Sequence, residues 1–291
     1  MLYDVSHRTT YRYSDPVPLA HNLTHLAPRT TAYQHCLRSV ISVNPMPVIT
    51  DAWQDYFGNQ VHYLTLEEPH QELSVTATSL VELRERAIPA PSMTPAWETA
   101  RDRLAAATDG ESIEASQFVF ESACIKRTSD VGAYAAPSFP AGRTLLAAAL
   151  DLTQRIHREF TYKPGATSVH TSTSEVLAQR QGVCQDFAHL QISCFRSVGL
   201  AARYVSGYLL TDPPPGQSRL VGADASHAWV SVYFPGIGWL DFDPTNNQMP
   251  QLRHVTVAWG RDFADVSPIR GIFLGGGKHS VHVAVDVVPH R

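Results

Sequence analysis

Cys184 is the residue of this sequence that is best placed to act as a nucleophile. It follows a glycine, Gly182, and begins residues 184–198, in which apolar side chains recur every three or four positions. This spacing predicts a helix with one buried face and with Cys184 at its N-terminus. There the unpaired backbone N–H groups and the helix dipole favour the thiolate, and the same groups can hold the oxyanion that forms when the thiolate attacks a carbonyl.

Controlled chemistry at an amide also needs a group that protonates the leaving amine, and imidazole suits this task. Among the 14 histidines, His227 is the best candidate because it begins the alternating segment 227–233. A short Pro-Gly turn separates this segment from a second strand-like one, residues 238–245. Pairing of the two as a hairpin brings Asp241 or Asp243 toward His227, where a carboxylate can fix the imidazole tautomer. Strand alternation puts both aspartates on one face, so spacing alone does not decide which of them contacts His227.

The elements that must position these residues are predicted from the patterns on either side of them. Residues 1–85 contain alternating segments separated by Asn-Pro, Gly-Asn and Glu-Pro, which predict a small antiparallel β domain. A Pro-rich stretch at 88–91 ends the strand pattern and suggests a domain boundary. Helical spacing follows at residues 95–126 and 144–160, and strand patterns return beyond residue 200.

The expected fold class is therefore α+β, with an N-terminal antiparallel β-sandwich-like domain followed by a core in which helices precede strands. We expect the N-terminal domain at residues 1–85 and a helical connecting region at 86–140. The catalytic core is expected at 141–250, and strands that complete the core at 251–291.

Composition narrows the possible partners. Of the 291 residues, 44% are hydrophobic and 17% are charged, which is typical of a folded globular protein. The formal net charge is -4 and Lys and Arg form no run, so we expect no nucleic-acid partner. No apolar run approaches the roughly 20 residues that cross a bilayer, and the N-terminus lacks the pattern of a secretory signal. No membrane contact and a cytoplasmic location are expected, and the oligomeric state is left open.

Four segments, in this order, resemble the bacterial transglutaminase-like superfamily: Gly-Val-Cys-Gln-Asp-Phe-Ala-His (182–189), Ala-Arg-Tyr-Val-Ser-Gly-Tyr (202–208), Ser-His-Ala-Trp-Val (226–230) and Gly-Trp-Leu-Asp-Phe-Asp-Pro-Thr (238–245). The N-terminal domain shares the resemblance through segments such as Asp-Tyr-Phe-Gly-Asn (55–59), and the C-terminal part through Gly-Arg-Asp-Phe-Ala-Asp-Val (260–266). Residues 86–130 have no match. The resemblance implies a papain-like core that uses Cys, His and Asp in that chain order, which assigns the roles to Cys184, His227 and Asp243.

Three further residues are candidates for the site wall. Tyr162 belongs to a segment that similar proteins show before the cysteine, and the resemblance implies that it lines the site or donates to the oxyanion. Asp186 and Asp224 either cap a helix and a strand end or shape the active-site wall. No cofactor is expected, and the calcium requirement of animal relatives is not carried over because no acidic loop has EF-hand spacing.

Competing interpretations of the same residues are weaker. Cys184, His189, Cys194 and His227 fit none of the paired short-spacer patterns of zinc sites, so no metal is expected. Cys194 lies on the apolar face of the predicted helix, and Cys36 and Cys124 belong to no motif. In a chain of this length, four cysteines also make no disulfide framework.

The predicted activity is acylation of Cys184 by an amide of a protein or peptide, either a glutamine side chain or a peptide bond. Attack of an amine on the thioester gives a transglutaminase. Attack of water gives a protease, isopeptidase or amidase. The alternative from another class of function is a binding module that keeps the fold without activity. The complete Cys-His-Asp set argues against it.

Overall fold

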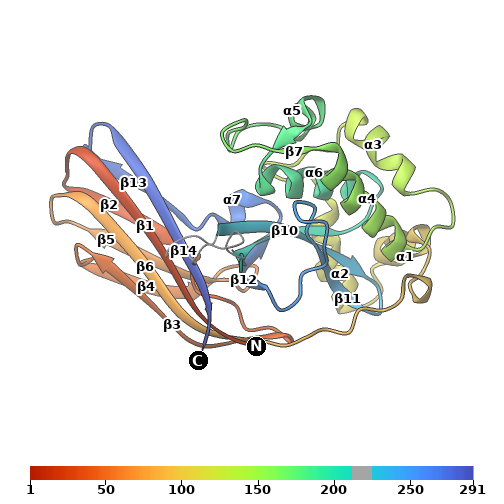
Figure 1. Ribbon diagram of the computed structural model, residues 1–291, viewed down its shortest axis with the longest axis horizontal. Coiled ribbons are helices and arrows are strands. Elements are labelled where there is room, and N and C mark those ends of the chain that lie inside the picture. Colours follow the sequence, from red (N-terminus) through yellow and green to blue (C-terminus); the bar gives the residue numbers. More distant parts are fainter. Residues whose placement is uncertain (212–224, 291) are drawn as a thin grey trace, which may run out of the picture.

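The computed structural model describes residues 1–211 and 225–290, and its N-terminal part forms two facing antiparallel sheets (Figure 1). The strand orders are β14-β1-β6-β3 and β13-β2-β5-β4. The strands of this sandwich are β1 (Leu2–Val17), β2 (Leu19–Thr24), β3 (Gln34–Asn44), β4 (Ile49–Gln54), β5 (Gln60–Leu66), β6 (His70–Leu83), β13 (Ile269–Leu274) and β14 (His279–Pro289).

Alternation along the strands builds the interior of the sandwich. Leu73 and Val75 from β6 pack with Leu64 and Leu66 from β5, and all four side chains are nearly inaccessible to solvent. The intervening residues of these strands point away from this interior, as a period of two requires. An N-terminal antiparallel sandwich is therefore present, as the sequence predicts.

The last two strands correct one expectation. Residues 251–291 were expected to complete the core, and β12 (His254–Gly260) does join the core sheet. However, β13 pairs with β2, and β14 pairs with β1 from Tyr3↔Pro289 to Tyr13↔His279. Figure 1 shows these C-terminal strands, in dark blue, beside the red N-terminal strands. The physical reason is that β1 and β2 would otherwise leave open sheet edges, and a local strand pattern does not specify which edge it will cover.

The core has its own four-stranded antiparallel sheet, in the order β11-β10-β9-β12. Its strands are β9 (Ala202–Leu209), β10 (Ala225–Phe234), β11 (Gly238–Phe242) and β12 (His254–Gly260). The α-helices are α1 (Trp97–Ala106), α2 (Gly110–Ser116), α3 (Ser129–Ala135), α4 (Leu145–Glu159), α5 (Thr173–Gln179), α6 (Cys184–Ser197) and α7 (Phe263–Val266). Single 3-10 turns are η1 (Pro91–Met93), η2 (Gln117–Val119) and η3 (Ala136–Ser138), and β7 (Thr161–Tyr162) pairs with β8 (Gln181–Gly182) in a small parallel ladder.

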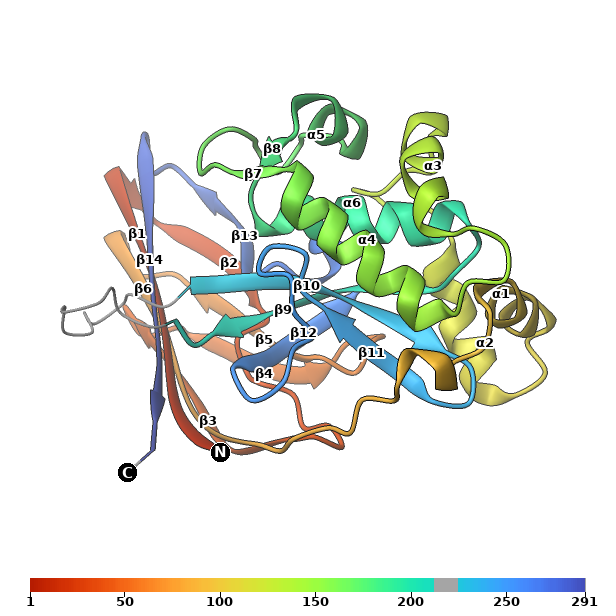
Figure 2. The same cartoon turned by 45° about the vertical axis from the view of Figure 1, so that its right-hand side comes forward.

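Helix α6 is the centre of this core. Every residue from Asp186 to Arg196 is buried, because α6 lies between the core sheet and the helices α3, α4 and α5. Figure 2 shows α4 and α6 crossing the strands of the core sheet on one face. A helix enclosed in this way has no freedom to rotate, so the position of its first residue, Cys184, is fixed by packing.

The sandwich packs against the core sheet. Tyr3, Val285 and Val287 belong to the same apolar cluster as Tyr208 and Val255 of the core sheet. The Tyr3 hydroxyl donates a 2.9 Å hydrogen bond to the backbone oxygen of Leu252. The long strands β1 and β14 thus take part in two packing interfaces. No helix among residues 1–211 and 225–290 is long and apolar enough to span a membrane.

The docking of β14 can be tested with two valines on the same face of the strand, one packed against the core and one beyond it. Val285 is 1% exposed and Val283 is 46% exposed. We expect Val285→Ala to lower the free energy of unfolding by about 2 kcal/mol, because it removes two buried methyl groups and leaves a cavity. Val283→Ala, the matched control, should change it by no more than about 0.5 kcal/mol. Urea unfolding measures both, and equal effects would contradict the docking of β14 on the core.

Candidate active site

Cys184 is the first residue of α6, and the short β7–β8 ladder fixes the chain just before it. Tyr162 pairs with Gly182 in this ladder, and the Lys163 N–H donates a 2.8 Å hydrogen bond to the Gly182 oxygen. Cys184 itself is partly exposed. The first N–H groups of a helix have no partner within the helix, so those of α6 surround a thiol that a substrate can reach.

Asp186 holds the N-terminus of α6 in place. Its Oδ2 accepts hydrogen bonds from the Val183 N–H at 2.7 Å and from the Thr167 hydroxyl at 2.6 Å. A Cβ on Gly182 would lie 2.7 Å from the same oxygen, which explains the glycine at this position. Burial raises the pKa of Asp186, although the hydrogen bonds from Thr167 and Val183 oppose this shift. Of the two roles open from the sequence, the geometry places Asp186 as a helix cap.

Tyr162 lies at the rim of the site. Its side chain is 53% exposed. Burial is the main cause that raises the pKa of Tyr162, and the negative charge of Cys184 adds to it, which places the phenol near the thiol. Asp224, the third candidate for the site wall, lies outside the described residues.

His227 lies between the thiol and a buried carboxylate. Its Nε2 is 2.8 Å from Asp243 Oδ2, which leaves Nδ1 as the ring nitrogen that is open to Cys184. Burial lowers the pKa of His227, but hydrogen bonds to Asp243 and Cys184 and the charges of both raise it to about 9. The imidazolium form therefore persists at neutral pH, next to a cysteine at a helix N-terminus.

Asp243 is fully buried, and it receives more hydrogen bonds than a triad alone requires. His254 Nε2 lies 3.1 Å from Oδ2 and the Asn246 amide donates to the same oxygen at 2.8 Å. The backbone N–H groups of Thr245 and Asn246 donate to Oδ1 at 2.9 and 3.1 Å. Burial raises the pKa of Asp243, but the hydrogen bonds from His227, His254 and Asn246 outweigh it and hold the pKa well below its usual range.

Asp241, which spacing alone could not distinguish from Asp243, has a different partner. Its Oδ2 accepts a 3.2 Å hydrogen bond from the Trp229 indole N–H. The alternation of β10 and β11 thus produces two parallel pairs, Asp243 with His227 and Asp241 with Trp229.

The sequence analysis did not identify two neighbours of Asp243, Asn246 and His254. Asn246 follows the Asp-Pro-Thr motif directly, and its position at the turn after β11 is a signal that could have identified it. His254 begins β12, and no motif marks it. Its ring contacts Trp229 edge-to-face with centroids 5.2 Å apart. Burial is the main cause that lowers the pKa of His254, although Asp243 opposes this shift.

His189 stays apart from this cluster. Its Nε2 accepts the Phe263 N–H at 3.1 Å, and burial lowers the pKa of His189 to about 4, so the ring is neutral. Within the described residues, His227, Asp243 and His254 are the group whose potential ligand atoms all lie within 4.8 Å of one another. A metal ion there would have to replace the hydrogen bonds that both rings make to Asp243.

Comparison with known proteins agrees with this geometry. The family described as "Bacterial transglutaminase-like N-terminal region" matches residues 3–82, and the transglutaminase-like superfamily matches residues 134–244. An uncharacterized protein of Mycobacterium tuberculosis is 43% identical over 99% of this chain and 92% of its own length. A protein-glutamine gamma-glutamyltransferase of Pseudomonas aeruginosa is 35% identical over 34% of this chain, which is 16% of that enzyme.

A solved structure supports the fold over the whole chain. A protein of Cytophaga hutchinsonii, described as a proposed cysteine protease, superposes with a TM-score of 0.75 at 23% identity, covering 100% of this chain and 92% of that one. Fold and site together define a cysteine-type enzyme fold with a transglutaminase-like core. The chain belongs to the bacterial transglutaminase-like proteins, with their characteristic N-terminal region preceding that core.

The influence of the thiol on His227 can be measured directly. Cys184→Ala removes a hydrogen bond and a charge that both raise the pKa of His227, so we expect the pKa to fall below about 9. NMR titration of the histidine ring carbons measures it, with Cys36→Ala as a control. Because the folded-state pKa lies above the ordinary 6.5, this pairing stabilises the fold at low pH and the contribution is lost as the pH rises to about 9. An unchanged pKa would show that the thiol does not act on the ring.

The four thiols should differ in their reaction with iodoacetamide at neutral pH. Burial raises the pKa of the other three, Cys36, Cys124 and Cys194, the last to about 12. We expect Cys184 to be labelled fastest by at least about tenfold, because it is partly exposed and paired with His227. Mass spectrometry of quenched samples gives each rate. His227→Asn should slow labelling of Cys184 alone, and equal rates at all four thiols would refute the activation.

Proposed function

We propose that this protein is a cysteine-dependent acyl-transfer enzyme that acts on amide groups of proteins or peptides. The observation that carries the proposal is the linked set of Cys184, His227 and Asp243, with the cysteine at the N-terminus of α6. The alternative of an inactive binding module is disfavoured, because a buried carboxylate and a raised histidine pKa are costly to maintain without a use.

In the proposed mechanism, the Cys184 thiolate attacks the amide carbonyl carbon, and the first N–H groups of α6 stabilise the oxyanion. His227 donates its Nδ1 proton to the leaving nitrogen, the C–N bond breaks, and a thioester forms. His227 then takes a proton from an incoming amine or water, which attacks the thioester and releases Cys184. Asp243 keeps the Nε2 proton in place throughout and stabilises the imidazolium.

A glutamine side chain is the substrate that we propose first. The local similarity to a protein-glutamine gamma-glutamyltransferase covers part of the core, and the chemistry above releases ammonia from such a side chain. Hydrolysis is the second candidate, because the thiol is partly exposed and water can reach the thioester. The two reactions share every step up to the acceptor.

Activity should depend on the three linked residues and not on the nearby Asp241. We expect Cys184→Ala to abolish the incorporation of a fluorescent primary amine into glutamine peptides, and Asp243→Asn to lower kcat by at least about 100-fold. Asp241→Asn, on the same face of the same strand, should keep activity near the wild-type level. Stopped assays of amine incorporation and of ammonia release measure both reactions.

Comparison of amine incorporation with ammonia release identifies whether the acceptor is an amine or water. Amine incorporation that is lost in Cys184→Ala supports transfer, and ammonia release without incorporation supports hydrolysis. Activity that survives in Cys184→Ala would refute the proposed nucleophile. A wild-type protein that is inactive on both glutamine and peptide amides would refute the proposal as a whole.

A further inference from the structure

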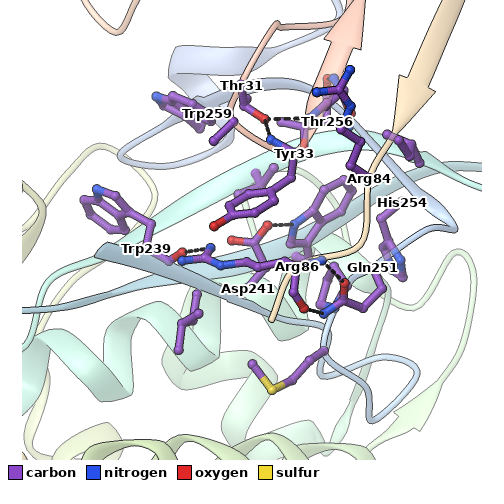
Figure 3. A pocket seen from close by; sticks show the side chains of 18 of the residues that line it. Thr31, Tyr33, Arg84, Arg86, Trp239, Asp241, Gln251, His254, Thr256 and Trp259 are labelled. Atoms are coloured by element: carbon purple, nitrogen blue, oxygen red, sulfur yellow. Dashed lines mark hydrogen bonds between the residues drawn. The ribbon is translucent and has the colours of Figure 1, made fainter. Parts of the chain in front are cut away.

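A cavity lies next to the residues that surround His227. It has a volume of about 330 Å³ and opens between the face of the core sheet and two segments of the N-terminal part, residues 31–34 and 83–88 (Figure 3). Asp241, Trp229 and His254 contribute to its wall, whereas Cys184 and His227 do not line it. The cavity is therefore separate from the thiol, although it shares a wall with the groups that position His227.

The most unusual residue of this cavity is Arg203 on β9. Its guanidinium carbon lies 4.1 Å from the centroid of the Trp239 ring and 3.7 Å from that of Trp259. Within residues 1–211 and 225–290 the guanidinium makes no hydrogen bond or ion pair, and its Nε is buried without a partner. Burial is the main cause that lowers the pKa of Arg203 to about 9, and the charge of Asp241 opposes this shift only in part. A guanidinium in this position lacks a bonded anion.

The other cations around the cavity already have partners. Arg84 pairs with Glu82 at 2.8 Å. Arg86 donates to the Trp239 backbone oxygen, and its own backbone N–H donates to Gln251 Oε1 at 3.1 Å. In Figure 3, dashed lines mark these bonds of Arg86 beside the labelled Asp241. Among the described arginines that line the cavity, Arg203 is thus the one whose guanidinium has no bonded partner, and contacts with two indole rings keep its plane from turning toward another group.

The charges of Arg203 and Asp241 and the side chains that line the cavity indicate the class of ligand. The flat guanidinium matches the two oxygens of a carboxylate. Asp241 already supplies one negative charge, which disfavours a doubly charged phosphate. The rest of the wall includes aromatic and aliphatic side chains, which suit an apolar body: Tyr33, Leu83, Val205, Trp239, Leu240 and Met249. We propose that this cavity binds a monocarboxylate with an apolar body, held by Arg203. A free organic acid and the C-terminus of a peptide both offer this chemistry.

Binding can be measured in the Cys184→Ala variant, so that the reaction at the thiol does not interfere. Three of the five tryptophans line the cavity, and quenching of their fluorescence reports occupancy. The probes are N-acetyl-phenylalanine and its amide, and a short peptide ending in phenylalanine with a free or an amidated C-terminus. We expect binding of the acids and at least about tenfold weaker binding of the matching amides. If only the peptide acid binds, the ligand of the cavity is the C-terminus of a peptide. If both acids bind, the cavity accepts a free organic acid.

Two substitutions with opposite expected effects test the assignment to Arg203. Arg203→Gln should weaken binding of the acid by at least about tenfold. Asp241→Asn removes the competing charge and should tighten binding several-fold, a gain that a damaged fold would not produce. Arg38→Gln makes the same charge change as Arg203→Gln at an exposed position on β3 and should leave binding unchanged. No binding of either acid, equal binding of acids and amides, or no tightening in Asp241→Asn would overturn the proposal, and none of these outcomes bears on the thiol chemistry.

Discussion

The buried charge of Asp243 is the constraint on which the site depends. A carboxylate without water is stable only where donors replace its hydration. Here the donors come from β10, from the turn after β11 and from β12, so those elements must be in place together before the charge is satisfied. Strand β9 lies between β10 and β12. Gly207 on β9 makes the approach possible, because a Cβ there would lie 2.5 Å from the Trp229 ring and 2.1 Å from the Val255 oxygen.

One face of the core sheet carries both the Asp243–His227 pair and the wall of the cavity, because every second residue of a strand points to the same face. At the end of β11, Asp243 fixes the histidine ring, and two residues earlier Asp241 faces a cavity with an unpaired guanidinium. The Trp229 ring lies between them and contacts both His227 and His254. The same pleat that orients the His227 ring thus supplies part of the cavity wall, and residues 31–34 and 83–88 of the N-terminal part contribute another part of it.

Much of this organisation follows from local sequence patterns. The helical spacing after residue 184 and the hairpin of β10 and β11 were predictable, because periodicity and turn residues act over short distances. The resemblance, not spacing, selected Asp243. The prediction for residues 95–126 was less accurate. The chain turns at Ala107, with φ of 44°, and forms two short helices there. The positions of His254 and β14 could not be predicted, because strand partners distant in the sequence leave no local signal.

The pairing of β1 with β14 joins two strands that are far apart in the sequence, with the core elements between them. Cys184, His227, Asp243 and His254 all leave the ribosome before residues 279–289 do. During synthesis the elements of the active site can therefore assemble while one edge of β1 is still unpaired. The sandwich can therefore be completed only after the core residues have been made, and contacts across so long a separation form slowly. Until then, the open edge of β1 can pair with strands of other chains.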